Sequence, residues 1–233
     1  MSGSWVMLIL IILSSIPVAA VYIWFRLARY QFSVVWFLLV LLAGAAAFFP
    51  ALILQNLLNF SISAGGRAEL FYQVFVRIAF TEELSRLFML LIFFWISGRI
   101  NPDEDSAQSL SYNAVKKGAA AGLVAGLGFA ILESAVYAAS NTGVLFLRAV
   151  TAAPLHAACG SRVGSAAKMF RSNPVQALSR LFAATAIHGI YNFMAAIPGF
   201  PSIAAVAIAL TALGSSILTI RGGWSGKNSE ENT

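Results

Sequence analysis

The sequence predicts an all-α integral membrane protein, a multi-pass bundle of about seven transmembrane helices. Of its 233 residues, 59% are hydrophobic and only 10% are charged, and the mean hydropathy is +0.81. Soluble domains carry about 25% charged residues, so this composition excludes a water-soluble globular protein. The apolar runs extend for about 20 residues, the length that an α-helix needs to cross the hydrocarbon layer. They do not alternate between apolar and polar residues, which favours helices over a transmembrane barrel.

The apolar runs follow one another along almost the whole chain. We predict spans at residues 4–25, 32–58, 71–97, 114–139, 144–169, 175–196 and 202–220. The first run continues to Phe25, and residues 1–5 contain no Lys or Arg, so we expect a membrane helix there rather than a cleaved signal peptide. Pro50 predicts a kink in the second span and Pro154 a bend in the fifth, because proline cannot donate the backbone hydrogen bond that continues a helix.

Small residues repeat in the fourth and fifth spans. Gly118, Gly122 and Gly126 recur every four residues in the fourth, and Gly160 and Gly164 do so in the fifth. This spacing lets membrane helices approach closely. We therefore expect tight packing of these helices, which would also bring polar side chains of neighbouring helices together.

Lys and Arg gather in one set of loops. They follow the first, third and fifth spans and lie in the tail, as Arg26, Arg29, Arg99, Lys116, Lys117, Lys168, Arg171, Arg221 and Lys227. The opposite loops contain only Arg67. Because cytoplasmic loops are enriched in Lys and Arg, we expect the N-terminus outside and the C-terminus in the cytoplasm. The net charge of +6 is then a topology signal, and we expect no nucleic-acid partner. Residues 1–220 would form one transmembrane domain and 221–233 a short disordered tail.

Five strongly polar residues interrupt spans that are otherwise apolar: Glu82, Glu83, Glu133, His156 and His188. A charge at the centre of a membrane helix costs roughly 2.5–3.5 kcal/mol, so such residues usually mark a function. Each also has a plain structural explanation. The glutamates could form an ion pair that locks two helices, and the histidines could donate interhelical hydrogen bonds.

Two spacings suggest partners within a helix. Glu82 and Arg86 are four residues apart, so we expect Arg86 to pair with Glu82 one turn away. Glu83 points about 100° around the same helix. His188 and Asn192 are also four apart and share a face. Two donors on one face could stabilise an oxyanion or make two interhelical hydrogen bonds.

The depth of these residues favours one common site. With a rise of about 1.5 Å per residue, Glu82 lies roughly 17 Å and His156 roughly 18 Å below the outer ends of their spans. Glu133 lies roughly 9 Å and His188 roughly 12 Å below theirs. Unrelated structural residues need not agree in depth. We therefore predict a single cluster between mid-membrane and the outer surface.

A cluster of glutamates and histidines has the groups that hydrolysis of an amide requires. The sequence contains no HExxH, which argues against a standard zinc protease, and no acid other than glutamate could complete a Ser-His-Asp triad. Paired carboxylates can act as general base for water. A histidine can orient that water or protonate the leaving amine, while His and Asn donors hold the oxyanion.

The four segments EELSR (82–86), GFAILES (128–134), LHAACG (155–160) and IHGIYN (187–192) together resemble the PrsW family of intramembrane proteases. That family belongs to a larger group that includes the CAAX prenyl endopeptidases. The segments occur in the family's order on successive helices, over about residues 70–196. The resemblance implies a multi-pass helical fold and a membrane-embedded endopeptidase. For PrsW itself it implies the first cut in an anti-sigma factor, on its extracytoplasmic side.

The resemblance also implies roles for individual residues. Glu82 and Glu83 match the family's glutamate pair, and Glu82 is our choice for water activation. Glu133, four residues after Phe129, takes the place of a histidine in the CAAX enzymes. His156 matches the third motif; His188 and Asn192 match the fourth, where oxyanion stabilisation is inferred. Two positions depart from the pattern: Arg86 stands where Lys is usual and Ser134 where Asn is common.

We therefore expect a peptidase of the bacterial inner membrane that acts on a membrane-anchored protein substrate within the lipid bilayer. We expect a glutamate-dependent mechanism without a cofactor. In the metal-dependent alternative, Glu82, Glu133, His156 and His188 would supply four ligands suitable for zinc. A proton-coupled transporter or channel could use the same cluster as its relay, although the spans show no internal symmetry of the kind common in transporters. An inactive scaffold of the same fold is a third alternative. The sequence does not specify the oligomeric state.

Overall fold

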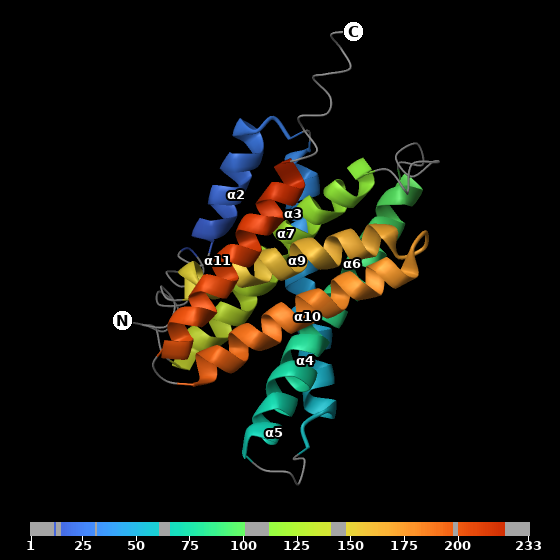
Figure 1. Cartoon of the computed structure of the whole chain (residues 1–233). Helices are drawn as coiled ribbons and strands as arrows, with labels where there is room; N and C mark the ends of the chain where they lie inside the picture. The colour runs from blue at the N-terminus through green and yellow to red at the C-terminus, as the bar shows by residue number, and fades with distance from the viewer. Residues whose placement is uncertain are drawn as a thin grey trace.

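The computed structural model describes residues 12, 15–30, 32–60, 66–100, 112–140, 148–197 and 200–221. These residues form helices and no strand, arranged as a bundle in which the chain runs back and forth between two ends (Figure 1). The C-terminal ends of α2, α6, α9 and α11 point toward one end of the bundle. The predicted all-α fold class is thus confirmed.

The first two predicted spans correspond to α2, α3 and α4. Helix α2 covers Ile16–Leu27 and α3 covers Val34–Ala46. Ser33 caps the start of α3, because its hydroxyl accepts a hydrogen bond from the Trp36 backbone N–H. Helix α4 covers Phe48–Leu57. The break at Ala47 follows from Pro50, whose ring nitrogen cannot donate to the Ala46 carbonyl. The predicted kink is confirmed.

The third span is one continuous helix of changing type. It begins as α5 (Gly66–Phe71), continues as the π-helix η1 (Tyr72–Phe80) and ends as α6 (Thr81–Ile100). At the junction the Thr81 hydroxyl donates to the carbonyls of Arg77 (2.6 Å) and Ile78 (3.0 Å). A π-helical segment rotates the residues that follow it relative to a regular α-helix, and such segments are frequent at functional sites.

The last four spans correspond to α7 (Tyr112–Ser140), α9 (Ala152–Met169), α10 (Pro174–Ala196) and α11 (Phe200–Arg221). Thr151 lies outside helical geometry with φ −122° and ψ −61°, and α9 begins just after it. Pro154 leaves the Val150 carbonyl without its usual backbone partner, in agreement with the start of α9 just after Thr151. The predicted bend of this span stays a prediction. The Asn173 side chain caps α10 by accepting from the Gln176 N–H at 3.1 Å.

Helices α7 and α9 pack with their backbones in contact through glycines. A Cβ added at Gly122 would collide with the Gly160 carbonyl, and one at Gly164 would collide with the Gly118 carbonyl. Gly126 lies in the same way against the carbonyl of His156. The predicted role of these glycines in close helix packing is confirmed.

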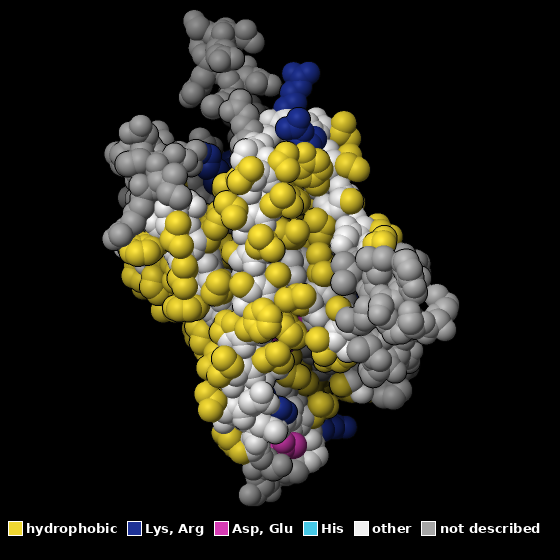
Figure 2. Space-filling model, turned by 180° about the vertical axis from the view of Figure 1, so that it is seen from behind, with side chains coloured by type: hydrophobic (Ala, Val, Ile, Leu, Met, Phe, Trp, Pro, Cys, Tyr) yellow, Lys and Arg dark blue, Asp and Glu magenta, His cyan; other side chains and the backbone are white. Residues whose placement is uncertain are grey.

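The outside of the bundle is apolar. Figure 2 shows hydrophobic side chains over most of one face, with Lys and Arg gathered near its ends. Large exposed side chains include Leu42, Ile53, Phe182, Ile203 and Leu218. Among the described helices, Val34–Leu57, Ala114–Tyr137 and Ile203–Arg221 are long and apolar enough to cross a membrane by composition alone. Helices α6, α9 and α10 instead carry buried polar side chains.

Candidate active site

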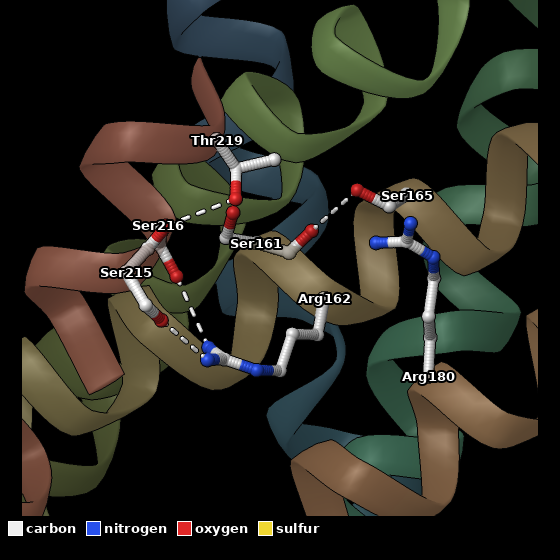
Figure 3. Close-up of a pocket in the computed structure, with 7 residues that line it drawn as sticks. All are labelled: Ser161, Arg162, Ser165, Arg180, Ser215, Ser216 and Thr219. Atoms are coloured by element: carbon white, nitrogen blue, oxygen red, sulfur yellow. Dashed lines mark hydrogen bonds between the residues drawn. The ribbon is translucent and has the colours of Figure 1, made fainter. Parts of the chain in front are cut away.

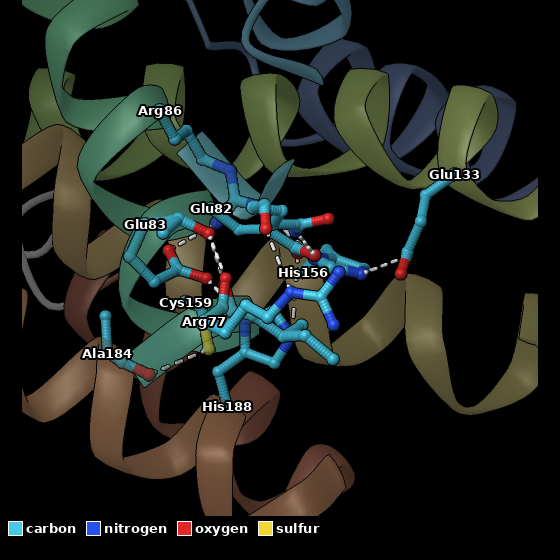
Figure 4. A network of polar contacts seen from close by, with 12 residues as sticks. Arg77, Glu82, Glu83, Arg86, Glu133, His156, Cys159, Ala184 and His188 are labelled. Carbon is cyan, nitrogen blue, oxygen red and sulfur yellow. Dashed lines mark hydrogen bonds and ion pairs between the residues drawn. The ribbon is translucent and has the colours of Figure 1, made fainter. Parts of the chain in front are cut away.

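The five polar residues predicted to cluster meet inside the bundle. Glu82 and Glu83 come from α6, Glu133 from α7, His156 from α9 and His188 from α10, and all five are buried (Figure 4). The imidazole rings of His156 and His188 lie at right angles with their centroids 5.0 Å apart. The depth argument from the sequence therefore led to the correct grouping.

The two adjacent glutamates face different nitrogens of one histidine, and only Glu83 is within hydrogen-bond distance. Glu83 Oε1 lies 2.8 Å from His188 Nδ1, and Glu82 Oε2 lies 3.7 Å from His188 Nε2. Since an ionised carboxylate can only accept, the 2.8 Å contact places a hydrogen on Nδ1. Nε2 therefore faces Glu82, either as a lone pair in the neutral ring or as a donor in the imidazolium.

Arg86 pairs with Glu83 and not with Glu82, contrary to the prediction from spacing. Arg86 Nη1 forms an ion pair with Glu83, both side chains being fully buried, and Nη2 donates to His156 Nδ1 at 3.2 Å. The guanidinium carbon also lies 4.7 Å from the centre of the Phe129 ring. Contacts with the neighbouring helices α7 and α9, through Phe129 and His156, accompany this i,i+3 pairing.

The contacts of His156 fix its tautomer. Arginine cannot accept a hydrogen bond, so Nδ1 of His156 must accept from Arg86 and Nε2 must carry the hydrogen. That N–H donates to Glu133 at 2.7 Å. Arg148, just before α9, holds the same carboxylate and also donates to the Ser134 hydroxyl at 3.2 Å. Ser134, one of the departures from the family pattern, thus contributes to holding Arg148.

Glu82 differs from Glu83 in reaching a cavity. A space of about 160 Å³ is lined by side chains from α4, η1, α6 and α7, including Gln55, Glu82, Phe129, Glu133 and Tyr137. Gln55 donates to Glu82 Oε1 at 3.1 Å. Glu82 Oε2 is buried and has no hydrogen-bond partner among the described residues. Both oxygens of Glu83 are therefore bonded, to Arg86 and to His188. Glu82 instead has one oxygen without a hydrogen bond and lines the cavity.

Three residues of the site were not predicted from the sequence: Gln55, Arg77 and Arg148. Arg77, in η1, donates from Nε to the Gln55 carbonyl at 2.9 Å and from Nη1 to Gln73 at 2.8 Å. It thereby holds the residue that orients Glu82. Arg77 and Arg148 both lie inside predicted spans, so the criterion that identified the glutamates would have found them too.

Asn192 lies one turn beyond His188 on α10 and is half-buried. Within the described part of the chain it makes no hydrogen bond to the cluster. Its predicted role beside His188 stays a prediction. Cys159 is buried with its thiol 3.5 Å from the Ala184 carbonyl.

Three residues could offer ligands to a metal ion. One side-chain atom each of Glu82, His156 and His188 lies within 4.8 Å of the others. Glu82 Oε2 and His188 Nε2 fit this role, because Glu83 holds the other nitrogen of His188 as the partner of a metal-bound imidazole should. His156 does not fit as arranged. Its Nε2 carries a hydrogen toward Glu133, and moving that hydrogen to Nδ1 would set two donors, Nδ1–H and Arg86, against each other.

Comparison with known proteins identifies the family of the chain. The model of a family described as PrsW family intramembrane metalloprotease matches residues 33–215, which include every residue of the cluster. No curated protein and no solved structure matches the chain.

Proposed function

Because the chain belongs to the PrsW family of intramembrane proteases, we propose that it cuts a membrane-tethered protein with water activated by Glu82. The observation that carries this assignment is the difference between the two glutamates. Glu83 is bonded to Arg86 and His188, while Glu82 lines the 160 Å³ cavity with one oxygen unpartnered.

The charges of the cluster favour one proton shared by Glu82 and His188. Arg86 pairs with Glu83 and Arg148 with Glu133. Glu82 has no guanidinium in ion-pair contact among the described residues, because Arg77 bonds to Gln55 and Gln73 instead. One negative charge is then left in a buried site, and burial of an unpaired charge is costly. A proton on His188 Nε2 balances it and leaves Glu82 free to act as a base.

Hydrolysis proceeds in this scheme by general acid and base catalysis. The water oxygen attacks the carbonyl carbon of the substrate while its proton passes to the Glu82 carboxylate. The carbonyl electron pair moves onto its oxygen, which His188 Nε2–H stabilises. When the C–N bond breaks, the protonated Glu82 returns the proton to the leaving amine. Asn192, on the same face of α10, is proposed as a second donor to the oxyanion.

A metal ion in this site would polarise the carbonyl or acidify water. Glu82, His156 and His188 would hold it, provided that His156 first released Glu133 and Arg86. Because the present hydrogen bonds oppose that change, we propose that Glu82 acts without a resident metal. We propose that Glu133, predicted from the sequence as a catalytic residue, contributes by holding His156.

We further propose a bacterial inner-membrane location with the cluster toward the extracytoplasmic side. The supporting observation is the Lys/Arg distribution of the loops together with the depth of the cluster. A single-span protein such as an anti-sigma factor, cut near its extracytoplasmic membrane boundary, is the proposed substrate class.

The test is cleavage of a labelled single-span protein by the purified chain in liposomes. Removing a general base typically lowers the rate about 10²–10⁴-fold, so Glu82→Gln should lose activity to that extent. Its amide oxygen can still accept from Gln55, which preserves folding. Glu69→Gln is the matched control, because Glu69 lies in α5, does not line the cavity, and as glutamine keeps an oxygen that can accept from Gln73. Full activity of Glu82→Gln would refute the proposed role. Uptake driven by a pH gradient, with no substrate cut by the wild type, would favour a transporter.

A further inference from the structure

A second polar pocket lies in the bundle, away from the glutamate cluster. It encloses about 90 Å³ between α9, α10 and α11 and is lined by Arg162, Arg180, Ser161, Ser215, Ser216 and Thr219, among others (Figure 3). Two guanidinium groups face hydroxyls there, and no carboxylate is among the described lining residues. The pocket thus has the residue types that bind anions.

Arg162 is held rigidly at one wall of this pocket. Its Nη1 donates to the Ala158 carbonyl at 2.9 Å and to the Ser216 hydroxyl at 3.1 Å, and its Nη2 donates to the Ser215 hydroxyl at 2.7 Å. Every one of these partners is neutral. The hydrogen bonds therefore fix the direction of the guanidinium without neutralising its charge.

Arg180 supplies the opposite wall and lacks such partners. It makes no hydrogen bond or ion pair with any residue that the structure describes, and its Nε is buried without a partner. Figure 3 shows its guanidinium directed toward the pocket from α10. A partly buried guanidinium with neither a hydrogen-bond partner nor a counter-charge is costly, so the pair of arginines calls for an anion.

The depth of the pocket identifies the kind of anion. Arg162 precedes the end of α9 by seven residues and Arg180 follows the start of α10 by six, which puts both about 10 Å from those helix ends. The hydrocarbon layer is about 30 Å thick within a bilayer of about 40–45 Å. The headgroup region adds about 5–7 Å on each side of the hydrocarbon, so helix ends at its outer edge put the pocket about 3–5 Å inside the hydrocarbon. That depth is within reach of arginine side chains directed toward the lipid phosphates, on the side that carries Arg171 and Arg221.

We propose that Arg162 and Arg180 bind a phosphate group, supplied by an anionic phospholipid such as phosphatidylglycerol. Arginine suits this ligand because its planar donors match phosphate oxygens. The bound headgroup would connect α9, α10 and α11, two of which carry His156 and His188. A choline headgroup would add a third cation beside the arginines, so zwitterionic phosphatidylcholine should bind more weakly. This inference does not depend on the proposed protease activity.

The test is the melting temperature of the full chain in neutral detergent, titrated with phosphatidylglycerol, phosphatidylcholine or inorganic phosphate. Phosphatidylglycerol should raise the melting temperature of the wild type and phosphatidylcholine should have a much smaller effect. A hydrogen bond to a charged group is worth about 1.5–3 kcal/mol, so Arg180→Gln should weaken phosphatidylglycerol binding by about 10–100-fold. Arg171→Gln is the matched control, since Arg171 is exposed at the same end of the bundle and does not line the pocket.

Two further measurements decide the remaining outcomes. If inorganic phosphate raised the melting temperature as much as phosphatidylglycerol does, the phosphate site would be upheld, but its ligand would be the free ion and not a lipid. If Arg180→Gln does not fold, Arg180→Lys keeps the charge but not the planar fork and should show weaker, still selective binding. Equal responses of the wild type, Arg180→Gln and Arg171→Gln to phosphatidylglycerol would overturn the proposal, as would a response of Arg180→Lys equal to that of the wild type if Arg180→Gln does not fold.

Discussion

Arg86 organises the electrostatics of the cluster at the scale of single residues. It neutralises Glu83, donates to His156 and lies over the Phe129 ring, and its side chain is fully buried. Through these contacts it fixes the hydrogen on Nε2 of His156 and leaves Glu83 free to hold His188. A lysine at this position would have no planar fork that could reach a carboxylate and an imidazole at once.

The Arg86→Gln variant should be strongly destabilised. Removing one partner of a buried ion pair costs about 3–5 kcal/mol, because the other charge is left unpaired. Thermal unfolding in detergent should therefore show a lower melting temperature, with a smaller loss for Arg86→Lys. Arg171→Gln, at an exposed site, should stay within about 0.5 kcal/mol of the wild type. Wild-type stability of Arg86→Gln would mean that Glu83 is not ionised in the folded protein.

Metal removal tests whether His156 donates a hydrogen bond to Glu133 or binds a metal ion. If its Nε2 hydrogen is held by Glu133, strong chelators should leave the cleavage rate unchanged, and elemental analysis should find much less than one zinc per chain. The matched comparison is Glu133→Gln, which should lower activity by disturbing His156 without changing the metal content. Loss of activity on chelation, with recovery on adding one divalent ion, would instead make Glu82, His156 and His188 ligands.

At the scale of elements, the glycine contact between α7 and α9 sets the distance between Glu133 and His156. The two backbones touch at Gly118, Gly122 and Gly126. No larger residue would let Glu133 of one helix reach His156 of the other in its present position. The π-helix η1 has a comparable role on the other side, because it carries Arg77, which holds Gln55 against Glu82.

The Gly122→Ala variant should lose both stability and activity. Its Cβ would meet the Gly160 carbonyl, and overpacking of this kind typically costs about 1–3 kcal/mol. A displacement of about 1 Å at a reacting group can lower the rate about 10²-fold. Gly214→Ala in α11 is the control, because a Cβ there meets nothing within 4 Å. Equal rates and melting temperatures for the two variants would argue against a close α7–α9 contact.

At the scale of the whole molecule, the bundle separates two polar centres. The glutamate cluster and the arginine pocket share α9, where His156 and Arg162 are six residues, or about 9 Å, apart along the axis. Carboxylates gather in the first centre, and guanidiniums without a described counter-charge lie in the second. An apolar outer surface surrounds both, as expected of a protein whose solvent is lipid.

The orientation of the bundle can be tested with reporter fusions. A reporter placed after Thr233 should be active only in the cytoplasm, and one inserted between residues 61 and 65 only outside it. The physical reason is the excess of Lys and Arg in the loops on the C-terminal side. A matched insertion between 101 and 111 should behave like the C-terminal fusion. The reverse pattern would place the glutamate cluster on the cytoplasmic side and contradict the proposed cleavage position.

The sequence by itself determined the helical class, the break in the helix before Pro50 and the gathering of the buried glutamates and histidines. It could do so because lipid makes each polar residue in a span costly, so the few that occur are conspicuous and can be compared in depth. The family resemblance rested on the same residues.

Only the tertiary structure decided which partner each polar group has. Spacing along one helix predicted that Arg86 would pair with Glu82. In the folded chain, Arg86 forms an ion pair with Glu83 and donates a hydrogen bond to His156 of α9. Gln55 joined the site because α4 packs beside α6. Such choices depend on the tilt and rotation of helices that are distant in sequence, and the hydrophobic pattern of a span that is apolar on all sides does not fix either angle.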